Sequence, residues 1–146
     1  MIANPRLAGL FNRALCHEMA AVQQYMMQSR LVALWGMEDR SRHFRNDVDE
    51  ELAHAERLME RMLHSGIPVN TTQLGAVRLG RGLAEILEIN RAIELEAVHL
   101  YSEAISYCER IRDYESRDLF ASILQDELGH LEEIGRMMKG ALKESG

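Results

Sequence analysis

The feature that most constrains the fold of this 146-residue chain is a repeat with an offset of 76 positions. Three pairs of residues with metal-binding side chains are separated by this offset: Glu18 and Glu94, Glu51 and Glu127, and His54 and His130. Longer stretches also align, such as Glu18-Met-Ala-Ala-Val-Gln-Gln-Tyr25 with Glu94-Leu-Glu-Ala-Val-His-Leu-Tyr101. The repeat predicts two copies of one helical hairpin. Each copy carries a lone Glu on its first helix and Glu-x-x-His on its second.

The composition favours helices over sheets. The chain has only two prolines, ten glycines and 5% aromatic residues, while 47% of its residues are hydrophobic and 27% are charged. These fractions are typical of soluble globular proteins. A chain of this length suits one domain, which we expect to span residues 1–146.

Four helices are expected from the apolar period and from capping residues. Asn4-Pro5 indicates a helix start, and Gly36 indicates the end of that helix after Trp35. The second helix is expected from about 39 to 64, the third from about 82 to 112, and the fourth from a break at 113–116 to 139–140.

The connection at 67–81 has no clear period and contains Pro68, Gly75 and Gly80. About 15 extended residues reach about 50 Å, whereas a helix of about 27 residues is about 40 Å long. The connection can therefore run the length of the bundle. The sequence predicts an all-α four-helix bundle with a long crossover between its second and third helices.

The six repeated residues indicate a site for two metal ions. Residues three apart share one helix face, so Glu51 and His54 can bind one ion together, as can Glu127 and His130. Glu51 also lies within an apolar stripe of helical spacing, formed by Phe44, Val48, Leu52, Ala55, Leu58, Met59 and Met62. Buried carboxylates need cations as counter-charges. Carboxylate with imidazole suits iron or manganese, and zinc could compete.

Other residues with functional side chains lie near these motifs. Glu96-Ala-Val-His99 is a third Glu-x-x-His, but it has no copy in the repeat and is expected on a solvent-exposed face. Tyr25 and Tyr101 each lie seven residues after a lone Glu. They are either core aromatics with a hydrogen-bonded hydroxyl, or phenols that can donate an electron to the metals. Three histidines without repeat partners are expected on the surface: His17, His43 and His64.

Charge and cysteine content limit the partners and the compartment. The net charge of −6 argues against nucleic acid and anionic membranes, and no apolar run approaches the roughly 20 residues of a membrane span. The N-terminal residues lack the pattern of a signal peptide. Cys16 and Cys108 are isolated thiols, which we expect to be packed side chains in a reduced cytoplasm.

At these residues the chain resembles bacterioferritin over nearly its whole length. The matching pieces are Glu18 with Tyr25, Asp49-Glu-Glu-Leu-Ala-His54, Gly66-Ile-Pro68, Glu94-Leu95, Asp113-Tyr-Glu-Ser-Arg-Asp118 and Asp126-Glu-Leu-Gly-His130. The resemblance implies a ferritin-like fold and a ferroxidase that oxidises two Fe(II) ions per subunit with dioxygen or hydrogen peroxide. It also implies a cage of twenty-four subunits that stores ferric mineral. By the resemblance, Glu51 and Glu127 bridge the irons, Glu18 and His54 complete one site, and Glu94 and His130 complete the other.

Three departures from the family pattern matter. Leu52 stands where the family has a haem-ligating Met, so haem b is not expected in the homo-oligomer, although a Met-bearing subunit could co-assemble. Asn46 stands where relatives with an inner-surface iron site have His, which leaves Asp47 and Glu50 as acidic substitutes. The chain ends six residues after Gly140, so the family's fifth helix is expected to be absent.

Assembly and three rival functions remain to be distinguished. Met19 and Met26, together with Leu52, are too many apolar residues for one narrow core, so a dimer is the minimum unit expected. The rivals are a haem-carrying electron-transfer subunit, a small di-iron oxidase or peroxidase resembling rubrerythrin, and a non-catalytic cage subunit. Leu52 argues against the first, the lack of a CxxC segment against the second, and the intact set of six ligands against the third.

Overall fold

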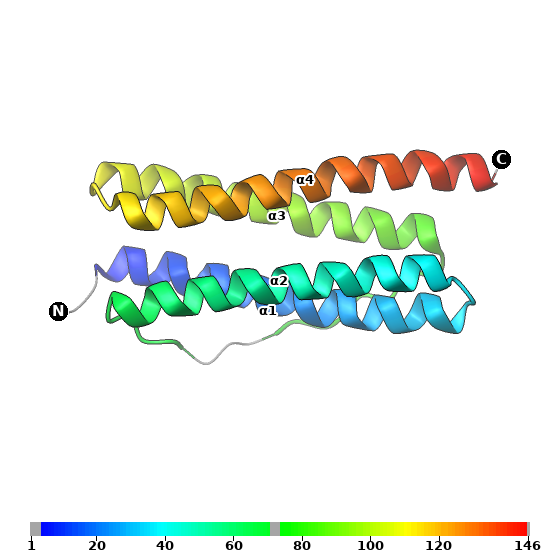
Figure 1. Ribbon diagram of the computed structural model, residues 1–146, viewed down its shortest axis with the longest axis horizontal. Coiled ribbons are helices and arrows are strands. Elements are labelled where there is room, and N and C mark those ends of the chain that lie inside the picture. Colours follow the sequence, from blue (N-terminus) through cyan, green and yellow to red (C-terminus); the bar gives the residue numbers. More distant parts are fainter. Residues whose placement is uncertain (1–3, 71–73, 146) are drawn as a thin grey trace.

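The computed structural model describes residues 4–70 and 74–145, without the side chains of 142–145. Its helices are α1 (Pro5–Leu34), α2 (Glu38–His64), α3 (Leu83–Arg110) and α4 (Tyr114–Ser145), and the described residues contain no strand. α1 and α2 form one antiparallel hairpin, and α3 and α4 form the other (Figure 1). The predicted all-α four-helix bundle is confirmed.

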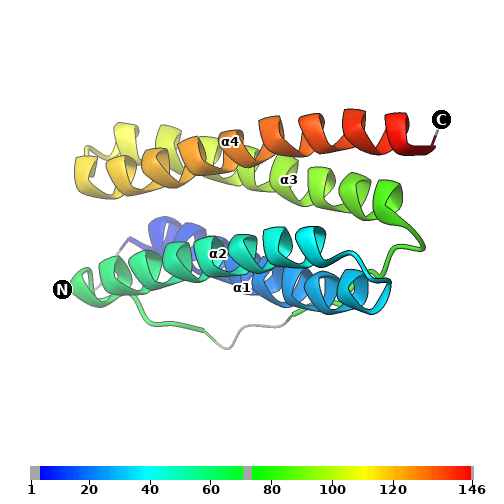
Figure 2. The same ribbon diagram turned by 45° about the vertical axis from the view of Figure 1, so that its right-hand side comes forward.

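A long crossover joins the two hairpins. It leaves the C-terminal end of α2 and runs beside the first hairpin to the opposite end of the bundle, where α3 begins (Figures 1 and 2). α2 and α3 are therefore parallel, as the length of the connection predicted. Thr71 and Thr72, which belong to the predicted connection, lie outside the described residues.

Two amide side chains of α1 hold the crossover. Asn12 donates a 3.1 Å hydrogen bond to the carbonyl of Pro68 and accepts one of 2.9 Å from the backbone N–H of Asn70. Gln24 donates to the carbonyl of Arg78 at 2.6 Å and accepts from its N–H at 3.0 Å. The described parts of the crossover thus have backbone hydrogen bonds to a helix, although they contain no secondary structure of their own.

The helix ends follow capping chemistry. Asn4 accepts hydrogen bonds from the backbone N–H groups of the first turn of α1, with Pro5 as the first helical residue. Gly36 and Gly66 follow the ends of α1 and α2 with φ of +83° and +67°. Arg112 takes the same left-handed conformation after α3, with φ of +61°, and lies 76 positions after Gly36. The repeat therefore extends to the turn of each hairpin.

α4 departs from the prediction at both ends. It begins at Tyr114, inside the predicted break, because Asp113 accepts hydrogen bonds from the backbone N–H and the hydroxyl of Ser116. It continues past Gly140 to Ser145. Three partly buried residues near this end pack against the apolar cluster that contains Val32, Phe44 and Ile134: Met137, Met138 and Ala141. This packing offsets the cost of a glycine inside a helix.

The apolar core is interrupted in the middle of the bundle. One large cluster, which includes Phe11, Leu58 and Phe120, fills one end, and the cluster around Phe44 and Ile86 fills the other. The predicted stripe of α2 is buried at Phe44, Val48, Ala55, Leu58 and Met62, and partly buried at Leu52 and Met59. Between these two clusters lie a small third cluster, which includes Val22 and Val48, and a group of buried polar residues that form the candidate site.

Candidate metal centre

All four helices contribute side chains to this polar interior. α1 provides Glu18, α2 provides Glu51 and His54, α3 provides Glu94, and α4 provides Glu127 and His130. Five of the six residues are buried, and the side chain of His130 is 12% exposed. The structure therefore brings together all six residues that the repeat predicted as ligands.

The six residues form two groups that share members. Glu18, Glu51, His54 and Glu127 make one group, and Glu51, Glu94, Glu127 and His130 make the other, with the potential ligand atoms of each group within 4.8 Å of one another. His54 Nδ1 lies 3.3 Å from Glu127 Oε1, and His130 Nδ1 lies 3.4 Å from Glu51 Oε1. Because Glu51 and Glu127 belong to both groups, the arrangement suits two ions bridged by two carboxylates.

Buried polar atoms without partners show that the donor set fits metal ions. Eight such atoms lie on these six side chains, and none has a hydrogen-bond partner among the described residues: Oε2 of Glu18 and Glu94, both carboxylate oxygens of Glu51 and Glu127, and Nδ1 of His54 and His130. Leaving a buried polar atom unpaired costs about 1–3 kcal/mol. Divalent cations of the iron or zinc type bind carboxylate oxygen and imidazole nitrogen, and would satisfy these atoms.

The carboxyl groups fall into two electrostatic classes in the metal-free site. Burial favours a raised pKa for Glu18 and Glu94, but close polar contacts outweigh it and lower both pKa values. The chief contacts are with Glu51 and His54 for Glu18, and with His130 for Glu94. Burial, reinforced by neighbouring carboxylates, raises the pKa of Glu51 well above its usual range and that of Glu127 to about 8. Glu18 and Glu94 are therefore ionised near neutral pH, whereas Glu51 and Glu127 are protonated.

Both imidazoles are cationic in this metal-free state. Burial alone would lower their pKa values, but contacts with Glu127 and Glu18 raise the pKa of His54 to about 11, and Glu94 raises that of His130 to about 10. Two imidazolium groups then balance the two ionised carboxylates. Two divalent cations would likewise balance all four carboxylates with both imidazoles neutral. The site is thus charge-balanced in either state, as a buried site requires.

Two tyrosines make crossed hydrogen bonds to the carboxylates. The Tyr25 hydroxyl donates to Glu94 Oε1 at 2.7 Å, and the Tyr101 hydroxyl donates to Glu18 Oε1 at 2.5 Å. Burial raises the pKa values of both phenols well above 10. The negative charge of Glu94 adds to this effect for Tyr25, and that of Glu18 adds to it for Tyr101. Both phenols therefore stay protonated and donate hydrogen bonds, which is compatible with both sequence interpretations of these tyrosines.

The remaining histidines differ from one another. His64 is exposed, as predicted, and His43 is partly buried between Asp47 and Glu133. The prediction of a surface position is wrong for His17, whose side chain is only 14% exposed and whose ring contacts the carbonyl of Ile93 at 3.1 Å. The cause is close packing of α1 against α3, which the repeat did not predict. Glu96 and His99, the third Glu-x-x-His, are exposed, as predicted.

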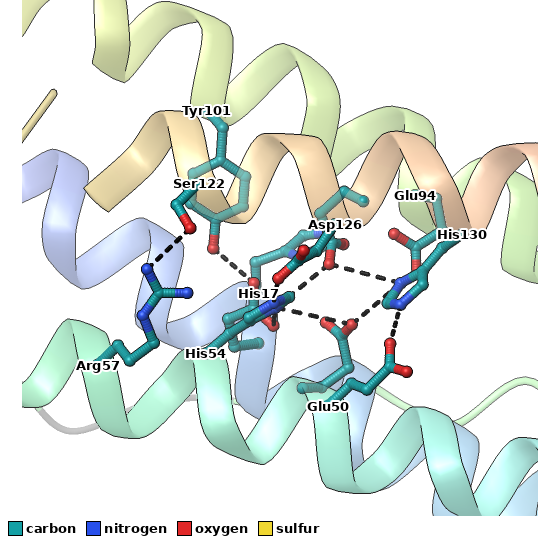
Figure 3. Close-up of polar contacts among 12 residues, drawn as sticks. His17, Glu50, His54, Arg57, Glu94, Tyr101, Ser122, Asp126 and His130 are labelled. Atoms are coloured by element: carbon teal, nitrogen blue, oxygen red, sulfur yellow. Dashed lines mark hydrogen bonds and ion pairs between the residues drawn. The ribbon is translucent and has the colours of Figure 1, made fainter. Parts of the chain in front are cut away.

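Sequence reasoning missed the outer contacts of the two clustered imidazoles. His54 Nε2 lies 2.8 Å from Asp126 Oδ2, and His130 Nε2 contacts Glu50 (Figure 3). Glu50 and Asp126 are 76 positions apart, and each directly precedes one of the shared Glu residues. That repeated acidic dipeptide was the available signal. Glu50 also forms a third acidic group with Asp47 and His130, and burial raises the pKa of Asp47 to about 7.

A pocket of about 460 Å³ opens beside the site between α2 and α4. Its walls include the imidazoles of His54 and His130 and the carboxylates of Glu50 and Asp126. Two small residues that are 76 positions apart, Ala53 and Gly129, also line it. Arg57 spans the same side of the bundle and donates a 2.9 Å hydrogen bond to Ser122 (Figure 3). Small ions and molecules can reach the imidazoles through this pocket.

The polar interior continues beyond the site on the side of Glu94 and His130. Gln28 donates a 2.7 Å hydrogen bond to Asn90, and both are buried. Asn90 lines a small cavity together with Tyr25, Glu94 and His130. The repeat equivalents of Gln28 and Asn90 are the buried Ala104 and Ala14. The surroundings of the Glu94–His130 group are therefore more polar than those of the Glu18–His54 group.

Comparison with known proteins agrees with this geometry. Residues 8–141 match the profile of the ferritin-like domain. A bacterioferritin of Rhodobacter capsulatus is 33% identical over 90% of this chain and 82% of its own length. The chain is a member of the bacterioferritin family. A bacterial ferritin of Synechocystis sp. is 32% identical over 92% of this chain and 94% of its own length, and a bacterioferritin of Mycolicibacterium paratuberculosis is 32% identical over 90% and 83%.

The region matched to the ferritin-like domain contains the whole candidate site. The six clustered residues, both tyrosines and the outer carboxylates all lie within 8–141. Within residues 4–70 and 74–145, no helix is long and apolar enough to cross a membrane.

Proposed function

We propose that the chain oxidises Fe(II) to Fe(III) at the buried site and stores the product as ferric mineral. The observation that carries the proposal is the set of eight unpaired donor atoms, arranged as two groups that share Glu51 and Glu127. Membership of the bacterioferritin family supports iron storage as the purpose of the reaction.

Each chain takes two Fe(II) ions as substrates. Glu18 and His54 bind one ion, Glu94 and His130 bind the other, and Glu51 and Glu127 bridge the pair. Each Fe(II) gives up one electron. The two electrons and two protons convert hydrogen peroxide into two waters, or convert dioxygen into hydrogen peroxide. The pocket between α2 and α4 gives such small oxidants access to the imidazoles.

Tyr25 adds a further source of electrons in this proposal. Its hydroxyl donates to Glu94 Oε1 at 2.7 Å and is fully buried. A phenol that loses an electron must also lose its proton, and Glu94 is placed to accept that proton. Tyr25 can therefore donate an electron when only one Fe(II) is present to reduce an oxidant.

Assembly follows from exposed apolar surface together with family membership. Met26 and Met27 on α1 are 40% and 44% exposed, and Met19 on α1 and Leu52 on α2 are half-buried. We propose that this surface forms an isologous dimer and that dimers build a cage of about twenty-four chains. Light scattering should then report a particle of about twenty-four times 16.7 kDa. A stable dimer after iron loading would contradict storage in a cage.

Two further expectations belong to this proposal. Leu52 provides no haem-ligating atom, so the homo-oligomer should bind no haem b, although a Met-bearing subunit could co-assemble. The two isolated cysteines of the sequence, Cys16 and Cys108, are those expected of a reducing, cytoplasmic location.

A pair of glutamates two residues apart provides the functional test. Glu94→Ala removes a ligand of the proposed site, whereas Glu96→Ala removes an exposed carboxylate from the same helix. In a stopped-flow assay with two Fe(II) per chain and air, Glu94→Ala should slow oxidation by at least about tenfold. Glu96→Ala should keep the wild-type rate. Equal rates in all three proteins would refute the site assignment.

A further inference from the structure

The outer nitrogen of each clustered imidazole contacts a carboxylate from the opposite hairpin. Asp126 on α4 reaches His54 on α2, with 2.8 Å between Oδ2 and Nε2. Glu50 on α2 reaches His130 on α4 in the same way. The two contacts cross the pocket in opposite directions (Figure 3). Each hairpin therefore holds a candidate ligand of the other.

The internal repeat shows that the two contacts are equivalent. Glu50 and Asp126 are 76 positions apart, and so are the histidines that they contact. The carboxylate side chains are 53% and 52% exposed, so neither was drawn to its imidazole by burial. The same contact thus occurs in both halves of the molecule, which a chance surface ion pair does not explain.

These contacts decide which imidazole nitrogen faces the site. When a cation binds, each imidazolium must lose one proton, and a carboxylate at Nε2 favours keeping the remaining proton there. Nδ1 is then left with a free lone pair. In both residues Nδ1 points inward, is buried without a hydrogen-bond partner, and lies within 4 Å of three carboxylate groups. A carboxylate behind a ligating imidazole also fixes the ring orientation and raises its basicity.

We propose that Glu50 and Asp126 are positioning residues that hold His130 and His54 ready to bind divalent transition-metal cations through Nδ1. Each half of the site is completed by a contact between the hairpins, so cation binding depends on their correct docking. This inference rests on the proposed function, because it assigns the outer contacts of the same site.

The test uses Co(II), because its visible absorption reports the geometry of its ligands. Air also oxidises Co(II) less readily than Fe(II). Wild-type protein should bind two Co(II) per chain. Glu50→Ala should weaken the binding of the ion held by His130 by about 10- to 100-fold, and Asp126→Ala should weaken the binding of the ion held by His54 to a similar extent. The double variant should bind both Co(II) ions more weakly than the wild-type protein does. Glu50→Asp and Asp126→Glu, which exchange the residues of the two repeats, should restore most of the affinity.

The control removes a charge from the same pocket without touching a clustered imidazole. Glu133 lines the pocket but contacts His43, so Glu133→Ala should leave both Co(II) affinities and the absorption spectrum unchanged. If Glu133→Ala weakens binding as much as Glu50→Ala, the effect is general electrostatics and the positioning role is wrong. Wild-type affinity in Glu50→Ala and Asp126→Ala would also overturn that role, and would leave the two-ion site intact. Failure of the wild-type protein to bind two Co(II) would instead count against the proposed function.

Discussion

Tyr25 on α1 donates its hydroxyl hydrogen bond to Glu94 on α3, at 2.7 Å, rather than to Glu18 on its own helix. Tyr101 on α3 returns the same contact to Glu18 on α1. The two phenols therefore tie the first helices of the two hairpins together at the site. This crossed pair matches the crossed contacts of Asp126 and Glu50 on the second helices.

Removal of either hydroxyl should slow iron oxidation without abolishing iron binding. Tyr25→Phe and Tyr101→Phe each leave a buried carboxylate without its donor, and each should cost about 1 kcal/mol of stability and slow oxidation by roughly tenfold. Electron donation should separate the two variants. With one Fe(II) per chain and hydrogen peroxide, electron paramagnetic resonance should detect a tyrosyl radical in wild type and Tyr101→Phe but not in Tyr25→Phe. A radical that persists in Tyr25→Phe would remove the proposed electron-donor role.

Metal binding should release protons near pH 7. His54, His130 and Glu127 hold protons there because their pKa values are about 11, 10 and 8, and the pKa of Glu51 is also raised. Bound cations require these four groups unprotonated. Since the metal-bound state holds fewer protons, binding should strengthen as pH rises towards 8 and weaken as pH falls. Zn(II) titration in weak buffer with a pH indicator should show more than one proton released per ion, and release of none would contradict the assigned protonation states.

Arg112 should be replaceable by glycine with a gain in stability. Its φ of +61° lies in the left-handed region, which costs a residue with a Cβ atom about 1 kcal/mol, and its repeat equivalent is Gly36. Arg112→Gly should therefore raise the free energy of unfolding by about that amount in urea denaturation. Arg110→Gly, inside the last turn of α3, is the control and should lower it. Loss of stability in Arg112→Gly would show that the arginine side chain makes a contact worth more than the backbone strain.

A single substitution should create haem binding if the dimer surface is otherwise suited to it. Leu52 is half-buried on α2, where it packs against the cluster that contains Val22 and Tyr25 of α1. Leu52→Met places a thioether at the position that ligates haem in the family pattern. Purified wild type should show no haem absorption, and Leu52→Met grown with haem should show a bis-methionine spectrum. Stoichiometric haem in the wild-type protein would mean that another residue ligates it.

The repeat predicted which six side chains meet in the middle of the bundle, because a helix converts sequence spacing into direction. Glu51 and His54 had to share a face, and the copy 76 positions later had to present the same face to it. Gly36 and Asn4 likewise predicted the limits of α1, since capping is local chemistry.

Contacts between helices were harder to predict, because they depend on how far one helix slides past another. The sequence placed Tyr25 on the face of Glu18 but did not show that its hydroxyl reaches Glu94. The same limit hid the contact of Asp126 with His54 and the burial of His17 against α3. Gly140 was given too much weight as a helix end, because packing of Met138 and Ala141 was not visible locally.

The proposed two-iron site is tested most directly by locating iron in crystals. Crystals grown without iron and soaked with Fe(II) under nitrogen should show two anomalous peaks per chain at the iron absorption edge. One peak should lie between Glu18 and His54 and the other between Glu94 and His130, with Glu51 and Glu127 contacting both. Iron found only on the surface, or a single ion within the bundle, would contradict the two-iron site on which the proposed ferroxidase function depends.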